Sequence, residues 1–206
     1  IASVTIIPIA LVAIPFGAVV ALQTGSLIQQ FGAQSFVGSA AVLAVLREAG
    51  PIATALMVAG AGGSAIAADL GARKIREELD AMMVLGIDPI QRLVVPRVLA
   101  CMLVAVFGVG GYIVNVLLQG GTPGAYLASF TALAQTPDLW QGMAKALVFG
   151  LIAAIVATYK GMNADGGPQG VGQAVMESVV ITFMLLFVAN FVMSALYFQL
   201  VPAKAL

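Results

Sequence analysis

Residues 69–80 read DLGARKIREELD, and seven of these twelve residues are charged. The chain of 206 residues has nine basic and nine acidic residues in total, so this stretch holds more than a third of them. The segment before it, 37–60, is largely apolar and is long enough to cross a bilayer as a helix. The charged stretch is therefore predicted to be a polar connection that follows a membrane span.

The composition supports a membrane protein. Hydrophobic residues make up 61% of the chain and charged residues only 9%, whereas a soluble domain is about 45–50% apolar. The net charge is zero, which excludes an overall basic field that attracts nucleic acid. The chain has one cysteine, no histidine and no GxxxxGK[ST] phosphate loop, so we expect no intramolecular disulfide, no metal site and no cofactor on this chain.

Five segments have the length and apolarity of transmembrane helices. They are residues 2–22, 37–60, 96–118, 142–160 and 176–199. The predicted fold class is an all-α integral membrane protein with about five transmembrane helices and one short amphipathic helix. No repeat or second domain is visible, so residues 1–206 are expected to form a single domain.

The positions of the basic residues predict which connections face the cytoplasm. Positive charge gathers in cytoplasmic connections, and here it lies between the second and third spans and at the start of connection 161–175. The residues are Arg73, Lys74, Arg76, Arg92 and Lys160. Connections 23–36 and 119–141 are then predicted to lie outside.

The charged stretch itself is predicted to form a short amphipathic helix. One apolar stripe at helical spacing contains Ile75, Leu79, Met82 and Met83. Gly86 is a helix stop, and Asp88 with Pro89 begins the next helix. Two interpretations are open: a helix that lies on lipid headgroups, or a docking helix for a soluble partner. The acids on its polar face favour docking, because headgroup-binding helices are rich in lysine and arginine.

Arg47 and Glu48 lie about ten residues into the second span, which places them near the middle of the membrane. A charge there costs roughly 2.5–3.5 kcal/mol. Adjacent residues on a helix point in different directions, so the two cannot simply neutralise each other. We place Lys145 and Glu177 near span ends, away from this depth. Either a polar network with Gln23, Asn115 or Asn190 compensates the two charges, or they face a hydrated cavity.

Residues Leu46 to Ala100 resemble the signature region of the MlaE/YrbE permease family. The motifs REAGP, EELDAM, GIDP and VPR occur there in order, and YKGMNADGGPQGVGQAV, residues 159–175, is similar to the family's second cytoplasmic segment. Members of this family are membrane subunits of ABC transporters that move lipids together with Mce-domain proteins. The resemblance covers essentially the whole chain and implies a lipid permease that is not itself an enzyme.

The resemblance also implies how such a chain meets its ATPase. The helix corresponding to Arg73 to Leu85 would be the coupling helix that sits in a groove of an ABC ATPase dimer, which carries the ATP and Mg²⁺. Residues 166–170 would be a second contact, or alternatively a flexible turn. The implied coupling residues are Arg73, Arg76, Glu77, Glu78, Leu79, Asp80, Met82 and Met83.

A lipid site is implied as well. Arg47 and Glu48 would face a hydrated cavity that receives the polar end of a membrane lipid, with Gln23 nearby. Phe16, Val19 and Val20 would line its acyl-chain part, although packing or lipid-facing roles are equally consistent with those three side chains.

The resemblance implies further partners. Five spans do not enclose a lipid-sized pathway, so a second permease chain, identical or a paralogue, is expected. Ala61 stands where many members carry an arginine, which favours a paralogue that supplies this charge. The family pattern includes an interfacial helix ahead of the first span, which would lie before Ile1.

Two other functions are considered. A secondary transporter or channel could use Arg47 and Glu48 as a coupling site, but no inverted repeat is visible. An intramembrane enzyme is disfavoured, because histidine and a nucleophile–base pair are missing from the sequence.

Overall fold

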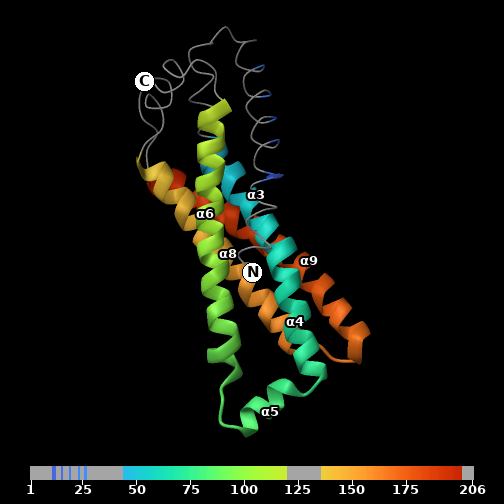
Figure 1. The fold of residues 1–206 in the computed structure, drawn as a ribbon. Coiled ribbons are helices and arrows are strands. Elements are labelled where there is room, and N and C mark those ends of the chain that lie inside the picture. Colours follow the sequence, from blue (N-terminus) through green and yellow to red (C-terminus); the bar gives the residue numbers. More distant parts are fainter. Residues whose placement is uncertain are drawn as a thin grey trace.

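A computed structural model gives the fold of residues 44–119 and 136–200, together with a few isolated positions between 11 and 26. The described residues form helices, and no strand occurs among them. Figure 1 shows them as an elongated bundle of long helices that run side by side. The all-α fold class predicted from the sequence is confirmed.

The elements follow one another along the bundle with short connections. The first part is one long helix in which π-helical turns alternate with α-helix, and it consists of η2 (Val45–Ala49), α3 (Gly50–Met57), η3 (Val58–Gly63) and α4 (Ser64–Ile75). The others are α5 (Glu78–Val84), η4 (Ile90–Val94), α6 (Val95–Gln119), α8 (Thr136–Met162) and α9 (Gly167–Leu200).

Four helices in the described part of the chain are long and apolar enough to cross a membrane. They cover Arg47–Ile75, Ile90–Gly108, Pro137–Met162 and Gly167–Leu200. The second to fifth predicted spans are thereby confirmed as helices. The first predicted span, 2–22, and the connection 23–36 lie outside the described residues except at isolated positions.

Three helix boundaries differ from the prediction. The helix of the second span continues to Ile75 instead of ending at residue 60, because its glycine- and alanine-rich sequence contains no proline that would stop it. Helix α8 begins at Thr136 instead of 142, with Pro137 in its first turn, and α9 begins at Gly167 instead of 176, followed by Pro168. The earlier start of α8 places Asp138 inside a helix.

Small residues allow the helices to approach closely. A methyl group added at Gly150 of α8 would lie 2.8 Å from the carbonyl oxygen of Cys101 on α6. One added at Gly161 of α8 would lie 2.9 Å from the carbonyl oxygen of Ala67 on α4. Helix α8 therefore packs directly against the backbones of both neighbours, as small residues permit in membranes.

Helix α5 and the turn between α8 and α9 lie at the same end of the bundle (Figure 1). This pairing agrees with the prediction that the connections after the second and fourth spans face the same side. The turn contains Gly166 and Gly167, both at positive φ, which glycine adopts without a Cβ clash.

The predicted amphipathic helix is not continuous, and this part of the prediction is wrong. Helix α4 ends at Ile75, Glu77 is left-handed with φ of 58°, and α5 begins at Glu78. Ile75 is therefore on a different helix from Leu79 and Met83, and the single apolar stripe does not exist. Leu79 is only 3% exposed and holds α5 against the bundle.

The predicted signals that end α5 and begin the next helix are confirmed. Gly86 has φ of 74°, its N–H donates to the carbonyl of Met83 at 3.0 Å, and the N–H of Ile87 donates to Met82 at 2.9 Å. This is a Schellman C-cap. The carboxylate of Asp88 accepts from the N–H of Ile90 at 2.9 Å and so caps the following helix.

Candidate functional site

Two ion pairs connect the second span to α8 inside the bundle. The Nη2 atom of Arg47 lies 2.7 Å from Oδ1 of Asp138, and Nζ of Lys145 lies 2.9 Å from Oε1 of Glu48. The side chains of Asp138 and Lys145 are 0% exposed. The two adjacent residues, which lie in the π-helical turn η2, thus each pair with a different residue of α8, and not with each other.

Lys145 has hydrogen-bond acceptors on two other helices. Besides Glu48, its Nζ donates to the carbonyl of Arg47 at 2.7 Å and to Oγ of Ser194 at 2.8 Å. In a regular α-helix the carbonyl of Arg47 would accept from residue 51, which is Pro51 and has no N–H. The lysine satisfies this carbonyl, and all three donors of its ammonium group are used.

Helix α9 supplies the other half of this polar network. Asn190 donates to Oε2 of Glu48 at 2.8 Å, and Ser194 donates to Oε1 at 2.7 Å. One turn further along α9, the hydroxyl of Tyr197 donates to Asp138. The guanidinium of Arg47 also lies 5.4 Å from the centre of the Tyr197 ring, within range of a cation–π interaction.

Two sequence predictions about these charges need correction. Lys145 was placed near the end of a span, but the early start of α8 puts it nine residues inside the helix, beside Glu48. Asn190 is confirmed as a partner. Gln23 is an exposed isolated position whose carbonyl accepts from Ser26 at 2.9 Å, and the side chain of Asn115 lies outside the described residues.

The depth of the network in a membrane stays a prediction, but its place along α8 is defined. Trp140 and Tyr159 on α8 are 64% and 65% exposed. They are 19 residues apart, about 28 Å along a helix and close to the thickness of the hydrocarbon core. Lys145 lies about 7 Å from Trp140 along α8, so the network lies towards the end of the bundle farthest from α5.

Three buried polar atoms near the network have no hydrogen-bond partner among the described residues. They are Oγ1 of Thr54, Oε1 of Gln141 and Oδ1 of Asn190. Gln141 lies between Asp138 and Lys145 on the same face of α8, and Asn190 touches Glu48. Buried acceptors normally have donors, so this region can accept hydrogen bonds from water or from a polar ligand.

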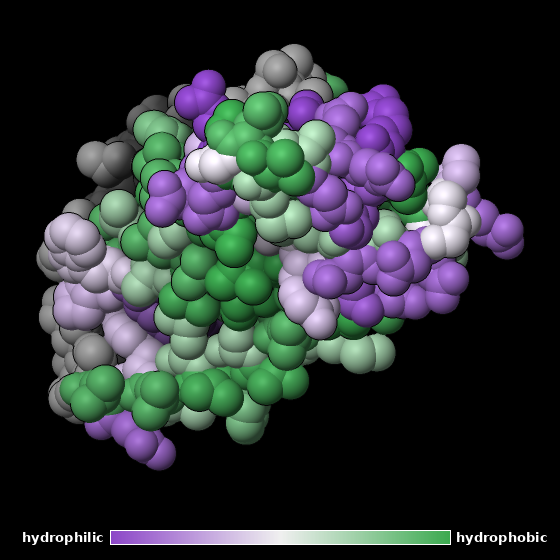
Figure 2. Space-filling view, turned by 90° about the horizontal axis from the view of Figure 1, so that it is seen from below, coloured by the Kyte–Doolittle hydropathy of each residue, from purple (hydrophilic) through white to green (hydrophobic). Residues whose placement is uncertain are grey.

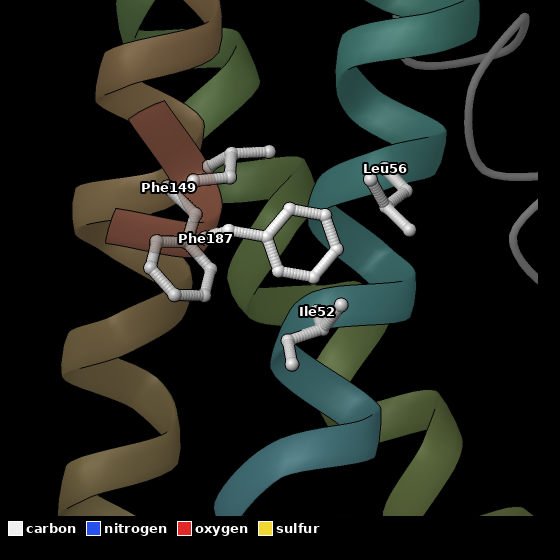
Figure 3. Close-up of a pocket in the computed structure, with 5 residues that line it drawn as sticks. Ile52, Leu56, Phe149 and Phe187 are labelled. Carbon is white, nitrogen blue, oxygen red and sulfur yellow. The ribbon is translucent and has the colours of Figure 1, made fainter. Parts of the chain in front are cut away.

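A narrow apolar crevice, which has no room for a water molecule, lies one helical turn from the network, towards α5. Figure 3 shows Ile52 and Leu56 projecting from one side towards Phe149 and Phe187 on the other, and Leu186 completes the lining. Ile52, Phe149 and Leu186 each lie four residues from Glu48, Lys145 and Asn190, respectively. Polar groups and an apolar crevice therefore adjoin along the same three helices.

The remaining predicted lipid contacts are on the first span. Phe16 and Val20 lie outside the described residues, and Val19 is an isolated, half-exposed position. Their role stays a prediction.

At the opposite end of the bundle, ion pairs surround the joint between α4 and α5. Arg73 lies 3.3 Å from both Asp69 and Glu78, and Arg76 lies 2.9 Å from Glu78. Lys74 pairs with Asp80 at 3.3 Å, and Arg97 of α6 pairs with Asp69.

The same end carries exposed apolar side chains. Met83, Val84 and Leu85 of α5 and its C-cap are exposed, and Val84 is 88% exposed. Figure 2, which views the molecule from this end, shows hydrophobic and hydrophilic side chains side by side across the surface. The predicted coupling residues Glu77 and Met83 lie on this surface, and Leu79 lies beneath it.

A model of the family described as Permease MlaE matches residues 1–196. The chain belongs to the MlaE permease family. A probable ABC transporter permease protein of Rickettsia felis is 36% identical over 192 residues, covering 89% of this chain and 74% of the relative. The intermembrane phospholipid transport system permease protein MlaE of Haemophilus influenzae is 29% identical over 192 residues, covering 88% and 74%.

A plant relative is also similar to this MlaE family permease. The chloroplastic protein TRIGALACTOSYLDIACYLGLYCEROL 1 of Arabidopsis thaliana is 34% identical over 179 residues, covering 82% of this chain and 51% of the relative. The resemblance seen in the sequence motifs is thereby confirmed, and so is the assignment as a membrane permease.

The α8 members of the network, and Ser194 and Tyr197 of α9, were not predicted as partners of Arg47 and Glu48. Asp138, Gln141 and Lys145 recur at i, i+3 and i+7, and Asn190, Ser194 and Tyr197 recur at i, i+4 and i+7. Each set is a polar stripe on one face of an otherwise apolar helix. The spacing of these polar residues could have revealed each stripe. On α8 it was not recognised, because the predicted span began at residue 142 and left out Asp138 and Gln141.

Proposed function

We propose that this chain is the membrane subunit of an ATP-driven lipid transporter whose ATPase is a separate protein. The observation that carries the proposal is the combination of a buried polar network with an adjoining apolar crevice inside a bundle of membrane-spanning helices. A membrane lipid has the same combination of a polar head and an apolar chain. The name of the relative from Haemophilus influenzae, a phospholipid transport system permease, supports the same class of substrate.

The lipid site consists of two parts in this proposal. Arg47, Glu48, Asp138 and Lys145 receive the polar head, because Gln141 and Asn190 offer free acceptors beside them. A segment of an acyl chain enters between Leu56 and Phe187 when the helices separate there, since the crevice has no room for a ligand in this structure. Phe16, Val19, Val20 and Gln23 of the first span complete the site, as the family resemblance implies.

The ATPase binds at the end of the bundle that carries α5, which we call the α5 end. The exposed apolar side chains there are surrounded by paired charges, which suits contact with a soluble protein. The name "probable ABC transporter permease protein" of the relative from Rickettsia felis supports an ABC ATPase as this partner, and the sequence has no phosphate loop of its own.

The assembly proposed has two permease chains, an ATPase dimer and an Mce-domain protein on the far side of the membrane. The α5 end faces the cytoplasm in the cytoplasmic membrane, because the basic residues gather there. The alternative of a secondary transporter that uses Arg47 and Glu48 to bind a coupling ion has less support, because the names of the relatives from Rickettsia felis and Haemophilus influenzae favour an ABC lipid permease.

Reconstitution of the permease with its ATPase and Mce partner tests the proposal. We expect ATP-dependent movement of a fluorescent phospholipid between the bilayer and the Mce protein. The Leu56→Trp variant puts a larger side chain where the acyl chain would enter and should reduce this movement, while Leu103→Trp, on the exposed face of α6, should not. Equal transfer with and without ATP would contradict the proposal.

A further inference from the structure

Asp69 is the residue at which three elements of the α5 end meet. It lies on α4, and its carboxylate accepts from Arg97 on α6 and from Arg73 one turn further along α4 at 3.3 Å. Arg73 in turn reaches Glu78, the first residue of α5, at 3.3 Å. A continuous chain of charged contacts therefore links α6, α4 and α5.

The backbone between α4 and α5 makes these contacts important. Arg76 leaves the helical region, and Glu77 is left-handed with φ of 58°, so the helical hydrogen bonding of α4 does not continue into α5. A two-residue joint of this kind does not by itself fix the angle between two helices. Side-chain contacts across the joint are what hold α5 at a defined orientation.

The contact between α4 and α6 is the most sheltered part of this chain of charges. The side chain of Arg97 is 17% exposed. Its Nη1 atom donates to the carbonyl of Leu93 at 2.8 Å, which fixes the direction of the guanidinium. Among the ion pairs of the described residues at this end, only the one through Asp69 reaches α6. Paired charges that are partly sheltered from water interact more strongly than exposed ones.

We propose that Asp69 is a positioning residue that locks α5 to α4 and α6, so that a displacement of α5 is carried into both spans. The helix that contains Asp69 runs without interruption back to Glu48, 21 residues away, or about 32 Å. A movement imposed on α5 by a bound ATPase is thereby delivered to the polar network at the other end. The inference rests on the ATPase part of the proposed function, but its structural half is independent of it.

Distance measurements between α5 and α6 test that structural half without any ATPase or lipid transfer. Spin labels are attached to cysteines at Ala81 and Leu99, which are both exposed, while the native Cys101 is fully buried. We expect Asp69→Asn and Arg97→Gln each to broaden the distribution of distances, and the double variant to broaden it no further. Asp69→Glu, which retains the charge, should largely restore the narrow distribution.

The control is Glu177→Gln. Glu177 pairs with Lys160 at 2.7 Å between α8 and α9, and its side chain is as exposed as that of Asp69, 43% in each case. It should leave the distances between α5 and α6 unchanged. An unchanged distribution in Asp69→Asn, or equal broadening in Glu177→Gln, would overturn the proposal, as would failure of both Asp69→Asn and Arg97→Gln to fold.

The functional half is measured in the reconstituted complex with its ATPase. We expect Asp69→Asn to hydrolyse ATP normally. It should move at least about fivefold less lipid for each ATP hydrolysed, which corresponds to a typical coupling energy between two sites. Normal lipid movement per ATP in Asp69→Asn would overturn the coupling role. A wild-type complex without ATP-dependent lipid movement would instead contradict the proposed function, and the distance measurement would still decide the role of Asp69.

Discussion

Lys145 shows how a charge is accommodated inside this bundle. Its ammonium group is completely buried and donates to three acceptors on two different helices. Asp138 is completely buried as well, and its carboxylate accepts from Tyr197 and from Arg47. Each ion pair therefore joins a buried charge on α8 to a more exposed residue of the second span.

Removing either charge of the second span leaves a buried charge on α8 without its counter-ion. Glu48→Ala does this to Lys145, and we expect a loss of about 3–5 kcal/mol of stability. Arg47→Ala should cost a similar amount, because it leaves the buried carboxylate of Asp138 without its cation. Thermal unfolding of the purified permease in detergent measures both.

The matched control for Glu48→Ala removes both charges of the pair. Glu48→Gln combined with Lys145→Met leaves no buried unpaired charge and should be more stable than Glu48→Ala alone. Equal stability of Glu48→Ala and the double variant would show that the unpaired charge of Lys145 does not cause the loss.

At the joint between α4 and α5, the backbone adopts a conformation that the local sequence does not favour. Glu77 adopts a left-handed conformation that favours glycine. We expect Glu77→Gly to raise the stability of the isolated permease by about 1 kcal/mol, and Glu77→Val, with its branched side chain, to lower it. Chemical unfolding of the two variants provides the comparison, and a stabilising valine would be inconsistent with the left-handed joint.

The exposed apolar side chains of α5 form the docking surface in the proposed function. Val84 is 88% exposed, so Val84→Asp should leave the permease folded while it weakens binding of the ATPase at least tenfold, as expected for a central contact of about 1.4 kcal/mol or more. Copurification and titration with the ATPase measure this loss. Gln91→Asp, another exposed position near this end, is the control; equal weakening by both would indicate a general charge effect.

The long apolar helices were predictable from the sequence because hydropathy over twenty residues is a strong signal. The end of α5 at Gly86 and the cap at Asp88 were predictable because glycine and aspartate have specific backbone roles there. The joint at Glu77 was not, because glutamate gives no sign of a left-handed conformation. The pairing of Glu48 with Lys145 was missed because it depends on how three helices pack, and the sequence does not specify their relative depth.

At the scale of the whole molecule, α9 has a large apolar surface that the rest of the described chain leaves exposed. Phe187, Phe191 and Phe198 are examples. Lipid tails or a second permease chain cover such a surface in a membrane. We predict two permease chains in each complex, so native mass measurement of the intact assembly should give two permeases for two ATPase subunits. One permease for two ATPase subunits would contradict this prediction.

The central claim is that a lipid occupies the polar network and the adjoining crevice. Its most direct test is photocrosslinking in the reconstituted complex, using a phospholipid with a diazirine in one acyl chain, followed by mapping of the labelled peptides. The account predicts labelling at Ile52, Leu56 and Phe187 that changes when ATP is added and decreases in Leu56→Trp. Labelling confined to exposed residues such as Leu103 and Phe107 on α6, with no change on adding ATP, would contradict it.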